Sequence, residues 1–157
     1  MKVARVGIIA TAVLAVATMA FAQKPDFSGT WTLDPEASGM PAGGGGGGGG
    51  RGGGGLGQGA TVKQAADTLT VERTFGDNKI TSTYKLDGTE SKNTMMGRGG
   101  EQMEMVSTAK WDGNKLTITT KTGQGESTQV WSLAGNVLTV ETTNARGTQK
   151  RVYKKTT

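Results

Sequence analysis

The sequence predicts an all-β domain, an antiparallel up-and-down β-barrel, on three observations. Short runs rich in Thr, Val and Ile follow one another from residue 60 onward, and these residue types favour strands. Turn signals built from Gly, Asn and Asp separate the runs about every ten residues, a spacing typical of a meander. Apolar and polar side chains alternate within the runs, so each strand has one dry face. Because a dry face must be covered, consecutive hairpins of this kind favour closure into a barrel.

The predicted strands can be placed in order along the chain. The first covers residues 27–36 and is ended by Pro35, because proline cannot donate to a strand ladder. Residues 87–100 are predicted to be a long connection without a strand. The other predicted strands are 61–65, 68–75, 79–86, 101–111, 115–122, 127–133, 137–143 and 148–155.

Residues 39–59 form a glycine-rich segment that holds more than half of the 27 glycines of the chain. Glycine has the largest backbone entropy and no side chain to bury. We therefore expect a flexible, disordered loop that adds nothing to the core. A barrel tolerates such an insertion if its flanks are neighbours in space, since loop closure costs only about 0.6 kcal/mol more for each doubling of length.

Residues 1–22 have the features of a cleavable bacterial signal peptide. A short positive start precedes the apolar residues 6–17, and Ala20-Phe21-Ala22 supplies the small residues of a cleavage site. The apolar run is shorter than the roughly 20 residues that a membrane-spanning helix needs. We therefore expect residues 23–157 to form one mature domain, periplasmic or secreted, with no transmembrane span.

The composition removes the usual means of catalysis. The chain has no cysteine and no histidine, so it has no thiol nucleophile, no thiolate metal site and no Ser-His-Asp triad. Glu101 and Glu104 are three residues apart on a predicted strand and face opposite sides, which makes them a poor acid–base pair. The glycine run lacks the Lys-Ser/Thr of a phosphate-binding loop. We expect no enzyme activity, no cofactor and no metal.

The charge indicates neither nucleic acid nor a strongly anionic partner. The formal charge is +5, and it falls to +3 when the two cations of the signal peptide are removed. This is too small to indicate nucleic-acid binding. A local basic cluster on the last predicted strand consists of Lys150, Arg151, Lys154 and Lys155. Two interpretations are open, a charged edge strand protected from pairing and weak contact with an anionic surface of the cell envelope.

A short motif near the start of the mature chain resembles that of a known family. Gly29-Thr30-Trp31 resembles the G-x-W motif of the lipocalin-like barrels, the calycins. The segment DFSGTWTLDPEAS, the repeated hairpin WDGNKLTITT and LAGNVLTVET, and the closing RVYKK are also similar to small exported bacterial proteins of uncharacterised function. In lipocalins the Trp packs across one end of the barrel beneath an Arg or Lys of the last strand. The resemblance implies these structural roles for Trp31 and Arg151.

The inward faces of the predicted strands indicate a binding module. A small barrel holds either its own side chains or one small apolar ligand. We expect five side chains to line a pocket for a small hydrophobic molecule: Tyr84, Met103, Met105, Trp111 and Trp131. The same alternation turns four polar side chains inward, and buried polar groups need partners such as water or a ligand: Ser82, Ser107, Thr120 and Gln129.

A second interpretation stays open. The five side chains would then simply fill the barrel. The protein would in that case be a structural or protein-interaction module of the cell envelope.

Overall fold

The computed structural model describes residues 24–40, 55–75, 78–96 and 101–156 of the chain. The predicted signal peptide and most of the glycine-rich segment lie outside these residues. Among the described residues, no helix has the length and apolar character needed to cross a membrane.

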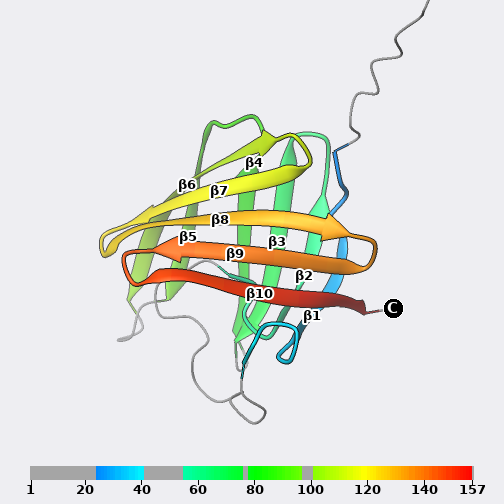
Figure 1. Ribbon diagram of the computed structural model, residues 1–157. Helices are drawn as coiled ribbons and strands as arrows, with labels where there is room; N and C mark the ends of the chain where they lie inside the picture. The colour runs from blue at the N-terminus through cyan, green and yellow to red at the C-terminus, as the bar shows by residue number, and fades with distance from the viewer. Residues whose placement is uncertain (1–23, 41–54, 76–77, 97–100, 157) are drawn as a thin grey trace, which may run out of the picture.

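Ten antiparallel strands form the described structure (Figure 1). They follow the order β4-β3-β2-β1-β10-β9-β8-β7-β6-β5, so chain neighbours pair except β4 and β5, and β1 pairs with β10. The all-β up-and-down barrel is confirmed. The strands are β1 (Gly29–Asp34), β2 (Gly59–Gln64), β3 (Thr68–Phe75), β4 (Asn78–Lys85), β5 (Glu90–Met96), β6 (Gln102–Asp112), β7 (Lys115–Thr122), β8 (Gly125–Ala134), β9 (Val137–Asn144) and β10 (Gly147–Thr156).

The barrel closes between β4 and β5 through side chains. These strands are the two ends of the sheet order. The Asn93 amide accepts a hydrogen bond from the Thr83 N–H at 2.8 Å and donates one to the Thr83 carbonyl at 3.0 Å. The Ser91 hydroxyl accepts from the Lys85 N–H at 2.8 Å. We call this contact the β4–β5 seam.

Strand β5 shows that the predicted connection over 87–100 is wrong. Its inward side chains, Ser91 and Asn93, are buried although they are polar. The alternation of apolar residues that marks the other strands is therefore missing here. Hydrogen bonds across the seam replace the apolar contacts that usually hold a strand in a barrel.

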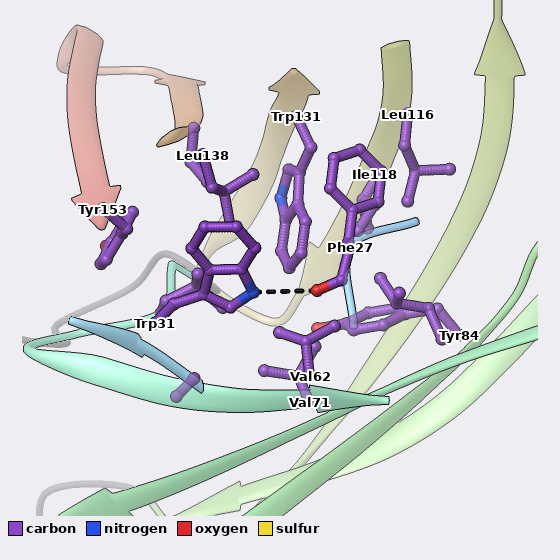
Figure 2. Packing of buried hydrophobic residues seen from close by; sticks show 14 of the residues in the cluster. Phe27, Trp31, Val62, Val71, Tyr84, Leu116, Ile118, Trp131, Leu138 and Tyr153 are labelled. Atoms are coloured by element: carbon purple, nitrogen blue, oxygen red, sulfur yellow. Dashed lines mark hydrogen bonds between the residues drawn. The ribbon is translucent and has the colours of Figure 1, made fainter. Parts of the chain in front are cut away.

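Aromatic side chains fill one end of the barrel, which we call the tryptophan end: Phe27, Trp31, Trp111 and Trp131. Figure 2 shows Phe27, Trp31 and Trp131 close together in the packed core. Phe27, just before β1, is fully buried; its ring stacks on Trp111 with centroids 5.8 Å apart and meets Trp131 edge-on at 5.6 Å. Trp31 donates from Nε1 to the Phe27 carbonyl at 2.8 Å. Gln64 holds the same segment by accepting from the Phe27 N–H at 3.0 Å. The N-terminal segment thus closes this end of the barrel.

The flanks of the glycine-rich segment contribute to the core, contrary to our expectation. Leu56 is only 1% exposed and belongs to the apolar cluster, and Met40 packs against that cluster. The Leu33 N–H donates to the Gln58 carbonyl at 2.9 Å, which fixes the returning chain beside β1. Leu56 and the hydrogen bond to Gln58 thus fix the residues that lead into β2.

The basic cluster on β10 contradicts two expectations, that β10 is an edge strand and that Arg151 covers Trp31. Strand β10 pairs with β1 and β9, so it is not an edge. Lys155, rather than Arg151, lies over the motif tryptophan, with Nζ 5.6 Å from the Trp31 ring. The reason is register, because Trp31 faces Lys155 across the ladder. Lys154 binds Asp34 at 2.7 Å.

Candidate ligand-binding site

A group of hydrogen-bond donors lies inside the barrel, on β3, β4 and β10. We call it the arginine–tyrosine cluster, and its members are Arg73, Ser82, Tyr84, Arg151 and Tyr153. Arg73 donates from Nη1 to the Gly55 carbonyl at 2.7 Å and from Nη2 to the Ser82 hydroxyl at 3.3 Å. Its Nε atom is buried and has no hydrogen-bond partner among the described residues.

The two tyrosine hydroxyls of the cluster stay protonated at neutral pH. Burial raises the pKa of Tyr84, and the opposing effects of Arg73 and of a hydrogen bond with Ser82 are smaller. Burial also raises the pKa of Tyr153 against the nearby Arg151 and Arg73. Tyr153 donates to the Gly57 carbonyl at 3.2 Å. Arg73 thus lies close enough to influence both hydroxyls.

Within the part of the chain that the structure describes, the cluster has two positive charges and no matching carboxylate. The ion pairs of the described residues join lysines to Glu72, Glu104, Glu126 and Asp34, and none includes Arg73 or Arg151. Arg73 and Arg151 are half-buried, and a guanidinium group that is partly withdrawn from water is stabilised by an anion that pairs with it. Its donors form a planar fork that matches a carboxylate or phosphate. The cluster is therefore suited to an anionic group.

A second polar surface lies on β6, β7 and β8, and we call it the polar wall. Its members are buried: Ser107, Thr120, Ser127 and Gln129. The Ser107 and Thr120 hydroxyls lie 2.9 Å apart and share a hydrogen bond. Gln129 accepts at Oε1 from Trp131 Nε1 at 3.0 Å, while its buried Nε2 has no partner in the described structure. Together with buried Ser82, this bears out the four polar side chains predicted to point inward.

The five predicted pocket residues are spread along the barrel. Tyr84 and Trp131 belong to the apolar cluster, and the half-buried Trp111 packs against it. Met105 is buried and Met103 is half-buried. Met103 and Trp111 are eight residues apart on β6, up to about 26 Å at the rise of a strand. The structure gathers the aromatic three near the tryptophan end and places the methionines farther along. That these five bind a ligand stays a prediction.

The arginine–tyrosine cluster was not predicted as a site. Part of the sequence evidence for this cluster is local, because Arg151 and Tyr153 are two residues apart and face the same side of β10. Arg73 likewise follows Val71 on the inward face of β3. What the sequence does not show is that β3 and β10 bring these side chains to the same place.

Comparisons with known proteins agree on architecture alone. No protein-family model matches the sequence, and no curated protein does. The structure is similar to that of the REP1-NXSQ fatty acid transporter, with 16% identity, 83% of this chain and 96% of that chain covered, and a TM-score of 0.58. A secretory abundant heat soluble protein from Ramazzottius varieornatus has 17% identity, coverage of 83% and 95%, and a TM-score of 0.56. Human cRBP IV has 19% identity, coverage of 84% and 99%, and a TM-score of 0.55. The chain therefore has the calycin-type, lipocalin-like β-barrel fold.

Proposed function

We propose that this protein is a non-catalytic binding module for a small hydrophobic molecule with an anionic head, of which a fatty acid is the simplest case. The observation that carries the proposal is the arginine–tyrosine cluster, where two guanidinium groups lack a carboxylate partner among the described residues. The similar fold of a protein described as a fatty acid transporter supports it.

The two ends of such a ligand would be recognised differently. The carboxylate would accept charge-assisted hydrogen bonds from the guanidinium groups of Arg73 and Arg151. The tail would lie among the apolar side chains of the barrel, gaining about 0.8 kcal/mol for each buried methylene group. The head would determine which amphiphile binds, and the tail would supply most of the affinity.

The test is isothermal titration calorimetry of residues 23–157 with stearate and with stearyl alcohol, which differ in the head alone. We expect stearate to bind at least about tenfold more tightly, since hydrogen bonds to charged groups are each worth about 1.5–3 kcal/mol. Arg151→Met should remove most of this preference. The matched control is Arg146→Met, because Arg146 is an exposed cation in the turn before β10.

Two results would count against the proposal. Equal affinity for stearate and stearyl alcohol would show that the arginine–tyrosine cluster does not distinguish a carboxylate from a hydroxyl group. No binding of either would favour the alternative, a structural or protein-interaction module. This alternative is favoured by the complete burial of Phe27 and Leu56, whose side chains help to fill the barrel core.

We further propose that the module acts after export, in the periplasm or outside the cell. The support is the sequence of residues 1–22. The intact mass of the protein recovered from the periplasm and culture medium of its host tests this, and a chain that begins at Gln23 is the expected result. Uncleaved protein retained in the cytoplasm would contradict it.

A further inference from the structure

Residues 55–58, which we call the returning strap, contact the guanidinium groups of the arginine–tyrosine cluster. The Gly55 carbonyl accepts a hydrogen bond from Arg73 Nη1 at 2.7 Å. A Cβ atom added to Gly55 would lie 3.7 Å from Arg151 Nη1, so the same residue also lies against the second guanidinium group. The chain itself therefore occupies a position from which one group can touch both arginines.

The rest of the returning strap is held inside the barrel by few contacts. Leu56 is 1% exposed and belongs to the apolar cluster, where its side chain takes up room that an apolar ligand tail would need. The Gly57 carbonyl accepts from the Tyr153 hydroxyl at 3.2 Å. The Gln58 carbonyl accepts from the Leu33 N–H at 2.9 Å. The strap thus stands in for both parts of an amphiphile, with carbonyl oxygens at the cluster and a leucine in the core.

Gly55 is an incomplete partner for Arg73. Its carbonyl oxygen is uncharged and meets Nη1 alone, while the buried Nε atom of Arg73 has no hydrogen-bond partner among the described residues. A carboxylate has two oxygens that match the guanidinium fork, and its charge-assisted hydrogen bonds are roughly twice as strong as neutral ones. An anion in the place of Gly55 would therefore satisfy Arg73 better than the strap does.

We propose that the returning strap is a built-in competitor of the ligand, which the anionic head displaces when it binds Arg73 and Arg151. This inference rests on the proposed function, because it takes the head to bind at the arginine–tyrosine cluster. The observed affinity would then include the cost of moving the strap, as for any protein whose binding-competent form is only partly populated. A change that weakens the anchoring of the strap should strengthen ligand binding.

The first test is calorimetry of residues 23–157 with stearate, for the wild type and for Leu56→Ala. The variant loses the side chain that anchors the strap, so we expect it to bind stearate about tenfold more tightly or better, although its fold is less stable. Val137→Ala is the matched control, because it shortens an exposed apolar side chain and should bind as the wild type does. More room for the tail would also tighten binding, so a second readout is needed.

The second test is amide hydrogen exchange of the wild type with and without stearate. Displacement of the strap removes the Gln58 carbonyl from the Leu33 N–H. Exchange of the Leu33 amide should therefore become about tenfold faster or more in the complex. The Trp131 amide, in a strand paired on both sides, should exchange no faster. A ligand that only fills a cavity would slow exchange at both amides or leave it unchanged.

The outcomes separate this inference from the proposed function. If stearate binds but the Leu33 amide exchanges no faster in the complex, the inference is overturned and the proposed function stands. The same holds if Leu56→Ala binds stearate no more tightly than Val137→Ala does. If stearate does not bind at all, both fail. If Leu56→Ala does not fold, the exchange measurement on the wild type decides.

Discussion

Gly29 is the residue on which the G-x-W motif depends. Its φ is +142°, a region that L-residues rarely adopt, and a Cβ placed there would collide with the Lys155 side chain, which lies across it toward Trp31. The glycine is therefore needed both for its backbone conformation and for the passage of the lysine stem. The motif describes one packing unit formed by β1 and β10.

Gly29→Ala should consequently lower the free energy of unfolding by about 1–3 kcal/mol, the cost of a residue forced into such a conformation. Urea denaturation followed by tryptophan fluorescence measures this. Gly123→Ala is the control, because Gly123 has no positive φ and no atom within 4 Å of the added Cβ. A loss for Gly29→Ala no larger than that for Gly123→Ala would contradict the explanation.

Asp34 is the residue through which acid should weaken the β1–β10 contact. Hydrogen bonds from Lys154 at 2.7 Å and from the Ala37 N–H at 3.1 Å lower the pKa of Asp34 in the folded state. A lowered folded pKa means that the charged form stabilises the fold above about pH 4 and that this stability is lost as pH falls through the folded pKa.

Asp34→Asn should therefore reduce the dependence of the urea midpoint on pH below about pH 4. Measurement of the midpoint across the acid range provides the check. Asp112→Asn is the matched change at an exposed carboxylate at the end of β6. If the two variants have the same pH profile, the contacts of Asp34 are not the cause.

At the scale of elements, Leu56 determines how the glycine-rich segment returns to the barrel. The side chain is 1% exposed, and the residues beside it bind the arginine–tyrosine cluster through the carbonyls of Gly55 and Gly57. Leu56→Ala should lower the free energy of unfolding by about 2–5 kcal/mol, because it leaves a cavity in the core. Val137→Ala, at an apolar side chain that is 37% exposed, should change it by no more than about 0.5 kcal/mol. Similar values for the two would mean that Leu56 is not anchored.

The strands that could be predicted are those whose faces differ in polarity. Leu116 and Ile118, or Leu138 and Val140, give β7 and β9 an apolar face that alternation reveals, and the hairpin turns between them are local. Strand β5 could not be found in this way, because Ser91 and Asn93 satisfy the backbone of another strand instead of filling the core. The position of β5 depends on hydrogen bonds to the backbone of β4. No sequence pattern within residues 90–96 predicts these bonds.

The candidate site was predictable in its components but not in its arrangement. Alternation placed Tyr84, Trp131 and Gln129 on inward faces, and all three are buried. It could not show that Phe27 would stack on Trp111, because Phe27 precedes the first strand of the sheet. Nor could it show that Lys155 faces Trp31, since only the register of β1 against β10 decides between the cations of the last strand.

At the scale of the whole molecule, the β4–β5 seam is the place where the described barrel can open without breaking a strand ladder. Every other adjacent pair of strands is joined by backbone pairing, whereas this pair depends on Asn93 and Ser91. Because β4 also carries Ser82 and Tyr84, opening the seam would move one side of the arginine–tyrosine cluster.

Asn93→Ala should therefore open the barrel locally rather than unfold it. The Thr83 N–H loses its acceptor, so its hydrogen exchange should become about tenfold to a hundredfold faster, as expected for a lost bond worth about 1–3 kcal/mol. The amide of Trp131, in a strand paired on both sides, should keep its protection. Asn114→Ala in the exposed β6–β7 turn is the control. If exchange at Thr83 and Trp131 rises together, the molecule opens by global unfolding, and the seam is no weaker than the ladders around it.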